Sequence, residues 1–394
     1  MHRTLLLALL VAQEFTPQCS GSPATTTPVA APAQNVQTII VNAGPTGDYF
    51  DGAFTSVTIC VPGSTTCQTI DGVLVDTGSS GLRVLSSAMS LSLPRQTGTN
   101  SAPIAECLQF LDGFTWGPVQ SADVKLAGEQ ANAVPIQVIG ESAFPVPSDC
   151  ANAGTDEDTL ASLGANGILG IGLFRQDCGS PCAFVGSSNP GLYYACPSVG
   201  GCQITAEPLT MQVQNPVWLF PTDNNGVVIQ LPTVPIGGAL TTTGALVFGI
   251  GTQTNNTLGS AKVLTVDGNG NFTTVFGNQS YASSFIDAGS NGIYFLDTAT
   301  TGLPVCPDSP NFYCPATLQT LSATNRGANG ATSAVTFSVG NNDTLNLKFS
   351  VFSEVAGPNA GSFDWGLGFF FGRSIYTAIE GQSTPDGQGP YWAY

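Results

Sequence analysis

Two aspartates stand at the ends of apolar, strand-like runs, where a carboxylate is costly unless it has hydrogen-bond or charge partners. They are Asp76, in VLVDTGSSGL, and Asp287, in SSFIDAGSNG. Each is followed by a turn of small residues: Thr77, Gly78 and Ser79 after the first, and Ala288, Gly289 and Ser290 after the second. An aspartate before such a turn often caps its own backbone, so one copy alone fits a structural role. One copy in each half of the chain indicates instead a matched pair of carboxylates.

Histidine is nearly absent, which narrows the chemistry that this chain can perform. The only histidine is His2, within an N-terminal segment that has the features of a leader peptide. Nucleophile systems built on Ser/His/Asp or Cys/His, and most catalytic zinc sites, need imidazole and are therefore excluded. Carboxylates remain as the main groups for acid and base catalysis, so we expect neither a metal nor a cofactor.

Each half also contains a later run of two apolar residues and a glycine. These runs are Ile168, Leu169 and Gly170 in the first half, and Phe370, Phe371 and Gly372 in the second. Elsewhere, short runs of β-forming residues alternate with Gly, Asn and Ser turns, and sustained helical periodicity is missing. The pattern predicts an all-β protein of two similar halves, for which we propose residues 36–213 and 214–394.

The N-terminus is typical of an exported protein. A basic residue precedes an apolar run that is too short to span a bilayer, as in signal peptides. We assign residues 1–19 to this signal and residues 20–35, rich in Pro, Ala and Thr, to a tether. The mature protein is then expected in the periplasm, on the cell surface or outside the cell. The 26 acidic and 9 basic residues of the full chain give a formal charge of −17, which argues against nucleic acid as a partner.

Eleven cysteines in an exported chain predict disulfides. Short spacings favour two local bridges, Cys60–Cys67 and Cys306–Cys314. Four others have spacings that imitate a metal cluster, although export favours disulfides for them as well: Cys178, Cys182, Cys196 and Cys202. Cys19 stands apart, just after the apolar run, and is a candidate lipid-attachment site that would anchor the protein to a membrane. Ordinary cleavage of the leader is the alternative.

From about Val36 to Tyr394, these motifs together resemble those of the pepsin-like aspartic peptidases. The resemblance implies a bilobal fold of two β-barrel-like lobes with an active-site cleft between them. It implies that Asp76 and Asp287 are the catalytic pair and that Ser79 and Ser290 hydrogen-bond their outer oxygens. It also implies that each apolar-apolar-glycine strand crosses beside its aspartate, in a psi-shaped motif.

The flap, a hairpin that closes over substrate in this family, is the first departure from the pattern. The matching segment supplies Phe110, Asp112, Gly113 and Trp116 as candidate substrate contacts, with Phe110 where the family has a tyrosine. Arg83 stands where the family usually has a tryptophan that hydrogen-bonds this tyrosine. Both partners of that contact are changed, which predicts a differently organised flap.

Ala288 is a further departure. The residue after the catalytic aspartate is usually Thr or Ser, whose hydroxyl takes part in a reciprocal hydrogen bond between the lobes. Thr77 retains its half of this bond, whereas Ala288 lacks the other. If Thr77 were left without a partner, we would expect a loss of about 1 to 3 kcal/mol at the lobe interface.

The function expected from these observations is that of an aspartic endopeptidase. Two neighbouring carboxyls that share one proton can activate a water for attack on a peptide carbonyl, which favours an acidic working range. The substrate would be an extended polypeptide and the enzyme a monomer. One alternative is a non-catalytic cell-surface or periplasmic protein that holds a peptide or glycan in the same cleft. A structural lipoprotein would explain the tether and the disulfides but not the paired aspartates.

Overall fold

The computed structural model describes residues 34–98, 101–111, 113–198 and 201–394. The expected signal peptide, Cys19, Asp112 and most of the expected tether lie outside this part of the chain. Gln34–Tyr394 form one compact unit. Asn35, which we expected to end the tether, already belongs to this unit, since it is fully buried and its side-chain amide donates to Phe248 O at 2.9 Å.

Six strands of the first half form a closed ring. Strand β2 pairs with β3 on one side and with β6 on the other, so the order β2-β3-β9-β4-β7-β6 returns to its start. The strands are β2 (Gly52–Cys60), β3 (Cys67–Asp76), β4 (Ser80–Leu85), β6 (Gly113–Leu126), β7 (Glu129–Ile139) and β9 (Gly167–Ile171). Every residue of β4 and β9 is buried, which explains why these two strands are nearly continuous runs of apolar and small residues.

Shorter elements extend one side of this ring. Strand β5 forms a hairpin with β6 and pairs with β10 on its other side. The additional elements are β5 (Ile104–Gln109), β8 (Thr155–Asp156), β10 (Tyr193–Ala195), β11 (Gln203–Ile204), α1 (Ser148–Ala151) and α2 (Leu160–Leu163).

The same sheet continues from the first half of the chain into the second. Strand β1 pairs with β2 and, on its other edge, antiparallel with β13, so that Val36 lies opposite Val247. The sheet then runs in the order β1-β13-β12-β22-β25-β14. These strands are β1 (Val36–Asn42), β12 (Gly226–Leu231), β13 (Thr242–Phe248), β14 (Val263–Thr265), β22 (Arg373–Ala378) and β25 (Tyr391–Ala393).

The second half has a seven-stranded sheet of its own, in the order β19-β18-β15-β16-β21-β17-β20. Its core is aromatic, with Phe363 stacked between Phe295 and Trp365 at centroid distances of 5.3 Å. The strands are β15 (Phe272–Phe276), β16 (Gln279–Ile286), β17 (Ile293–Leu296), β18 (Gln319–Arg326), β19 (Thr332–Val339), β20 (Ala356–Gly357) and β21 (Asn359–Trp365). Helix α3 (Thr298–Thr301) and the small ribbon of β23 (Ser383–Thr384) and β24 (Gly387–Gln388) complete the α-helices and strands of the described residues.

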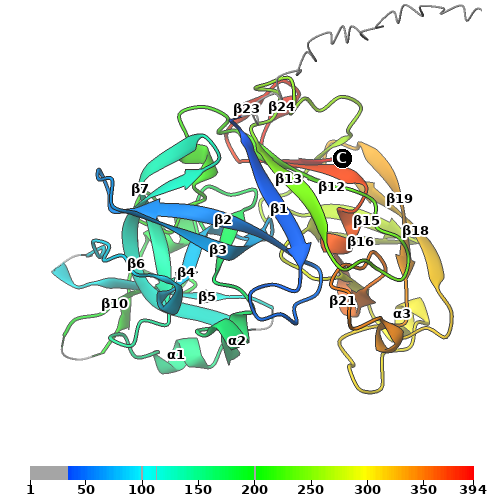
Figure 1. Ribbon diagram of the computed structural model, residues 1–394, viewed down its shortest axis with the longest axis horizontal. Helices are drawn as coiled ribbons and strands as arrows, with labels where there is room; N and C mark the ends of the chain where they lie inside the picture. The colour runs from blue at the N-terminus through cyan, green and yellow to red at the C-terminus, as the bar shows by residue number, and fades with distance from the viewer. Residues whose placement is uncertain (1–33, 99–100, 112, 199–200) are drawn as a thin grey trace, which may run out of the picture. The chain divides into compact units, whose positions relative to one another are not determined.

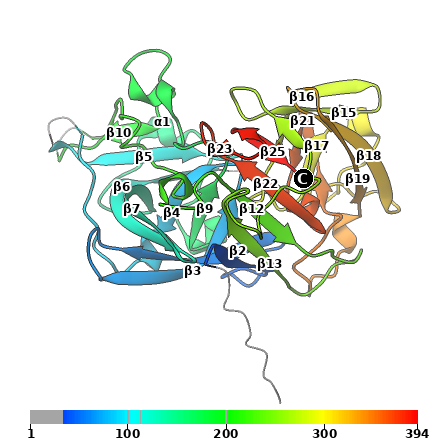
Figure 2. The ribbon, with the colours of Figure 1, turned by 90° about the horizontal axis from the view of Figure 1, so that it is seen from above.

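The prediction of an all-β, bilobal fold is confirmed. Figure 1 shows the first-half strands β2 to β7 on one side, β15 to β19 on the other, and β1, β12 and β13 between them. Figure 2 shows the same division from above, with β12 and β22 between the two groups. We keep residues 213/214 as the proposed boundary between the lobes. The shared sheet connects the lobes and carries Asp76 at the end of β3, whereas Asp287 follows β16 in the separate sheet of the second lobe.

Ten cysteines form five disulfides within the described residues. The two local bridges that we predicted, Cys60–Cys67 and Cys306–Cys314, are confirmed. The other three pairs are Cys107–Cys150, Cys178–Cys182 and Cys196–Cys202. This number of disulfides indicates an exported protein. In the described part of the chain, no helix has both the length and the apolar character needed to cross a membrane.

Candidate active site

The turn that follows β3 wraps its backbone and side-chain donors around Asp76. Asp76 Oδ1 accepts the amide N–H groups of Gly78 at 2.7 Å and Ser79 at 3.2 Å. The Ser79 hydroxyl donates to the other oxygen, Oδ2. Three donors therefore hold the carboxyl plane in place at the end of a buried strand.

The turn that follows β16 repeats this arrangement around Asp287. Asp287 Oδ1 accepts the N–H of Gly289 at 2.7 Å, and the Ser290 hydroxyl lies 3.0 Å from Oδ2. The two turns, Asp76–Ser79 and Asp287–Ser290, are called the aspartate turns below. They come from different lobes and present their carboxyls in the same way.

The two carboxyls meet at the glycines of the aspartate turns. The Gly78 N–H also lies 3.0 Å from Asp287 Oδ1, so one amide contacts both aspartates. A Cβ added at Gly78 would stand 2.6 Å from Asp287 Cγ, and one added at Gly289 would stand 2.9 Å from Asp76 Cγ. Such separations are too short for any side chain, so glycine is required at both positions for the lobes to approach.

The electrostatics of the pair follow from this closeness. Burial, then the negative charges of Asp76 and Asp364, raise the pKa of Asp287 well above its ordinary value, while the Gly289 N–H opposes the shift. Because the Gly78 amide N–H lies within 3.0 Å of an oxygen of each aspartate, the carboxyls of Asp76 and Asp287 are close neighbours. Two acids in such contact titrate as a unit and retain one proton between them to a higher pH than an isolated aspartate would.

Thr77 links the lobes beside the pair. Its hydroxyl donates to Ile286 O at 3.2 Å and accepts the N–H of Ala288 at 2.9 Å. Although Ala288 has no hydroxyl to return the bond, Thr77 is therefore fully satisfied. The loss of stability that we made conditional on an unpaired Thr77 does not arise.

Each aspartate lies beside a crossing strand, and the first of these is the one expected. Strand β9 pairs in parallel with β3, with Leu169 opposite Val75 and Gly170 opposite Asp76. Ile168 lies two residues before this glycine and is buried. Gly172 N–H, just after β9, donates to Ser79 O at 2.8 Å and closes the motif.

In the second lobe the predicted crossing residues Phe370, Phe371 and Gly372 were wrong. Strand β21 pairs in parallel with β16, with Asp364 opposite Phe285 and Trp365 opposite Ile286, and the Asp287 N–H donates to Trp365 O at 3.1 Å. The crossing motif is thus Asp364, Trp365 and Gly366. Leu367 N–H donates to Ser290 O at 2.8 Å, the counterpart of the Gly172 bond in the first lobe. The polar Asp364 interrupts the apolar run expected of a crossing strand, whereas Phe370, Phe371 and Gly372 match that pattern and were therefore assigned in its place.

Asp364 is the site residue that the sequence pattern failed to indicate. It is fully buried, and its Oδ2 lies 2.7 Å from the Ser290 hydroxyl oxygen. Burial raises the pKa of Asp364 to about 8, a shift that the Ser290 hydroxyl opposes and the charge of Asp76 increases. A third carboxyl therefore joins the second aspartate turn.

The flap prediction was only partly correct in its geometry. Phe110 is partly exposed at the tip of the β5–β6 hairpin, where its N–H donates to Gly113 O at 2.7 Å. Gly113 is buried against β8, since a Cβ there would stand 2.4 Å from Thr155 O. Trp116 does not face substrate: it is 2% exposed and its indole N–H donates to Phe144 O at 2.8 Å. Asp112 lies outside the described residues.

Arg83 takes part in a buried ionic cluster in place of a flap contact. Its guanidinium lies 2.9 Å from both Glu106 Oε1 and Asp177 Oδ2, and it donates to Ser80 O at 2.8 Å. The Tyr193 hydroxyl donates to Asp177 Oδ1 at 2.7 Å. Burial and the neighbouring Glu106 raise the pKa of Asp177 well above its ordinary value. We call Arg83, Glu106, Asp177 and Tyr193 the Arg83 cluster.

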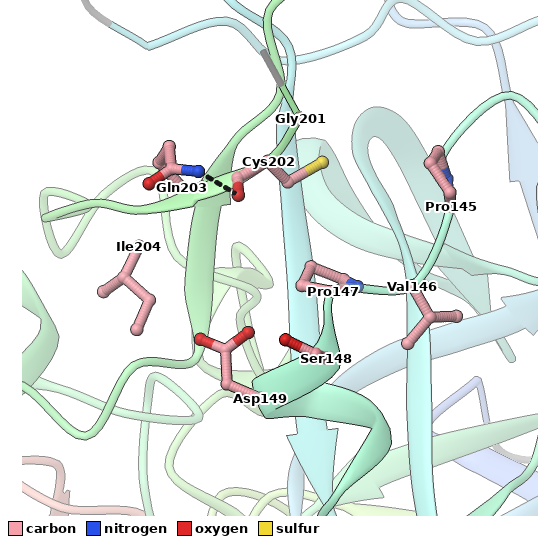
Figure 3. A pocket seen from close by; sticks show the side chains of 9 residues that line it. All are labelled: Pro145, Val146, Pro147, Ser148, Asp149, Gly201, Cys202, Gln203 and Ile204. Atoms are coloured by element: carbon pink, nitrogen blue, oxygen red, sulfur yellow. Dashed lines mark hydrogen bonds between the residues drawn. The ribbon is translucent and has the colours of Figure 1, made fainter.

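A separate hollow opens beside α1 and β11. Figure 3 shows it between Pro145–Asp149 and Gly201–Ile204, with a volume of about 560 Å³. Neither aspartate turn borders it. It is therefore not part of the candidate active site.

Comparison with known proteins shows to which family the chain belongs. The model of a family described as "Protein of unknown function (DUF3443)" matches residues 31–394. The chain belongs to the DUF3443 family. No match was found among curated protein sequences.

A solved structure shows how this DUF3443 protein relates to a known fold. The chain is similar to the crystal structure of an aspartic proteinase from Irpex lacteus, with 16% identity and a TM-score of 0.53. The match covers 91% of this chain and 96% of the other. At this identity the likeness shows the fold alone, which is pepsin-like.

Proposed function

We propose that this DUF3443 protein is an aspartic endopeptidase with Asp76 and Asp287 as its catalytic pair. The observation that carries the proposal is the shared Gly78 amide, 2.7 Å from Asp76 Oδ1 and 3.0 Å from Asp287 Oδ1. Two carboxyls from different lobes are thereby held in contact, and each has its own serine and glycine donors. A structural turn aspartate needs no such partner from the other lobe.

The chemistry follows from one proton shared by two acids. The ionised member takes a proton from a water held between the pair, and that water attacks the carbonyl carbon of the peptide bond. The protonated member gives its proton to the developing oxyanion. In the second stage the member that took the water proton gives it to the leaving nitrogen as the C–N bond breaks. A hydroxyl of the tetrahedral intermediate gives its proton to the other carboxylate as the C=O bond forms again, so the pair returns to its starting state with one proton. Neither imidazole nor a bound cofactor takes part.

The substrate class is an extended polypeptide. Main-chain hydrogen bonds can hold such a segment regardless of sequence, while side-chain pockets select the residues around the cleaved bond. We propose that the protein is exported and acts as a monomer at acidic pH, with Cys19 as a candidate lipid anchor. Its formal charge of −17 does not favour nucleic acid as a partner.

Peptide cleavage by the purified mature chain tests this function. Activity is measured from about pH 2.5 to about pH 7, with and without pepstatin, for the parent and for Asp76→Asn and Asp287→Asn. We expect acid-dependent cleavage that falls by at least about a thousandfold in either variant. Asp308→Asn, at an exposed position, is the matched control and should cleave like the parent.

The outcomes separate the catalytic proposal from its alternative. Pepstatin resistance together with loss of cleavage in both variants keeps the aspartate pair but indicates a remodelled cleft. A folded preparation that cleaves nothing at any pH, or variants that cleave as well as the parent, would overturn the peptidase. Binding of a peptide or glycan in the cleft would then be the function to test.

A further inference from the structure

Asp364 occupies a position that is apolar in the first lobe. It precedes the glycine of its crossing strand by two residues, as Ile168 does in β9. Both side chains are buried, at 0% exposure for Asp364 and 4% for Ile168. A carboxyl in such a position is costly unless it stays neutral or finds a partner.

The hydroxyl of Ser290 lies between two carboxyls, and counting hydrogens shows what this requires. Ser290 Oγ is 3.0 Å from Asp287 Oδ2 and 2.7 Å from Asp364 Oδ2. A hydroxyl carries one hydrogen, so it can donate to only one of the two oxygens. The second contact is a hydrogen bond only if a carboxyl supplies the other hydrogen. One of these two acids is therefore protonated when both bonds are present.

The surroundings favour Asp364 as the protonated acid. Its Oδ1 has no hydrogen-bond partner, and no basic side chain forms an ion pair with it among the described residues. Asp287 Oδ1, in contrast, lies within 3.0 Å of two backbone N–H groups, those of Gly289 and Gly78. Donors of this kind stabilise the ionised form of a carboxyl, and their absence favours the neutral form.

The charges of the ionisable groups around Asp364 also favour its neutral form. Asp287 faces it from the end of β16, Asp76 from the first lobe, and Tyr294 is its register partner on β17. None of the three carries a positive charge, so none of them is a counter-ion for an ionised Asp364. The raised pKa of Asp364, about 8, agrees with this arrangement.

We propose that Asp364 is a positioning residue of the active site: its carboxylic acid donates to Ser290 Oγ and thereby directs the Ser290 hydrogen onto Asp287 Oδ2. Two hydrogen bonds in a row strengthen each other, because the first makes the hydroxyl a better donor. The chain Asp364–Ser290–Asp287 holds the plane of Asp287 more firmly than Ser290 would alone. Its effect on turnover rests on the proposed peptidase function, whereas the protonation of Asp364 does not.

Carboxyl titration tests the protonation directly and needs no activity. The protein is labelled with ¹³C at the aspartate carboxyls, and spectra of the parent and of Asp364→Asn are compared from about pH 4 to about pH 9. We expect one resonance, absent from the variant, that titrates near pH 8. If the missing resonance titrates below about pH 5, the surroundings of Asp364 do not favour its neutral form and the proposal is overturned.

Kinetics of four variants test the positioning role. In Asp364→Asn the amide N–H can still donate to Ser290, so kcat should stay within about twofold of the parent. Asp364→Val removes the donor and should lower kcat by about 2- to 10-fold, with a change in KM of less than about twofold. Ser290→Ala combined with Asp364→Val should be no slower than Ser290→Ala alone, because Asp364 acts through Ser290. Ile136→Val, at a buried position of β7 outside the aspartate turns and the crossing strands, is the control in the first lobe and should leave kcat unchanged.

Two kinetic results would overturn the proposal. The first is an Asp364→Asn variant as slow as Asp364→Val, because donation to Ser290 would then not be the property that matters. The second is a double variant slower than Ser290→Ala by the full Asp364→Val factor, because the two residues would then act independently. If the parent cleaves no peptide, the proposed function fails, and the titration by itself still decides the state of Asp364.

Discussion

Buried acids lie beside both aspartate turns, and the two lobes neutralise them by different means. In the first lobe Arg83 contacts Glu106 and Asp177 at 2.9 Å each. In the second lobe Asp364 and Asp287 share Ser290, and no cation pairs with either of them in the described part of the chain. The first group has an arginine as a permanent counter-ion. The second group has no counter-ion, so only protonation neutralises its acids.

Because of this difference, a change of pH should alter the charge of the buried acids in one lobe more than in the other. An arginine stays charged throughout the working range, so the Arg83 cluster retains its counter-ion at any pH. A carboxyl that relies on a proton becomes an unpaired buried charge once that proton leaves. Asp177 in the Arg83 cluster also has a raised pKa, but Arg83 still pairs with it once it ionises, so we expect the second aspartate turn to be the more pH-sensitive of the two groups.

The largest expected effect comes from removing the counter-ion of the first lobe. Arg83→Met leaves two buried acids without a cation and should lower the free energy of unfolding by about 3 to 5 kcal/mol. Urea unfolding at neutral pH measures this. Arg95→Met is the matched control, because the Arg95–Glu141 pair is partly exposed and should contribute less than about 1 kcal/mol. Equal losses in the two variants would contradict the role given to the Arg83 cluster.

The next effect concerns the contact between the lobes. Gly289→Ala places a methyl group 2.9 Å from Asp76 Cγ and should separate the two carboxyls, with a loss of about a hundredfold in kcat/KM. Circular dichroism checks that the fold is kept. Gly268→Ala is the control, since a Cβ there meets no atom within 4 Å. A fully active Gly289→Ala variant would show that the two aspartates need not touch.

The pH dependence of the free energy of unfolding tests whether Asp364 is neutralised by a proton. Asp364 has an ordinary pKa near 3.8 when unfolded and a raised one of about 8 when folded, so over this range the folded state holds more protons. The free energy of unfolding should then fall as pH rises from about 4 to about 8. Asp364→Asn cannot lose a proton and should flatten the upper part of this curve. Urea midpoints at several pH values measure both, and an unchanged slope in the variant would rule out the assignment.

The two serines of the aspartate turns should differ in their contribution to stability. Ser290→Ala removes a partner from both Asp287 and Asp364 and should lower the free energy of unfolding by about 1 to 3 kcal/mol. Ser79→Ala removes a partner from Asp76 alone and should cost about 0.5 to 1.5 kcal/mol. Parallel urea titrations near pH 5 compare them. A larger loss in Ser79→Ala would reverse the comparison between the lobes.

The smallest effect concerns the missing hydroxyl at Ala288. Thr77 reaches Ile286 O and Ala288 N–H, so by the symmetry of the two turns a hydroxyl at 288 would face Val75 O and Thr77 N–H. Ala288→Ser should therefore change the free energy of unfolding by less than about 1 kcal/mol. Thermal or urea unfolding detects a change of this size. A larger loss would show that the packing around Ala288 has no room for a second link.

Several features of the fold and site were predictable because they depend on residues close together in the sequence. The run into each aspartate and the small residues after it define the turn, so both turns were found from local pattern, and the repeat of that pattern in the second half suggested that Asp76 and Asp287 form a pair. Cys60–Cys67 and Cys306–Cys314 pair across seven and eight residues and were found in the same way. Strand β9 was identified because GILGI is apolar throughout and is buried throughout.

Other features were missed because they depend on contacts between distant segments. Arg83 has partners 23 and 94 residues away, and only the tertiary structure brings Glu106 and Asp177 to it. Trp116 was predicted to be a flap residue, but in the structure it is buried and its indole N–H donates to Phe144 O. The crossing strand that contains Asp364 was not recognised in the sequence. Such strands are identified by a run of apolar residues, and the polar Asp364 interrupts that run.

The sequence by itself determined the chemistry that is available: carboxylates, no imidazole other than that of His2, and two small-residue turns that keep an aspartate at the end of a buried strand. Hydrogen bonds within a turn span two or three residues, so their pattern is visible in the chain. The tertiary structure alone decided which acids share protons and which have a cation. The Gly78 amide meets Asp287, 209 residues further on, and Ser290 meets Asp364, 74 residues further on, only because the strands pack side by side. At these distances the pKa of each acid depends on neighbours that the sequence does not reveal.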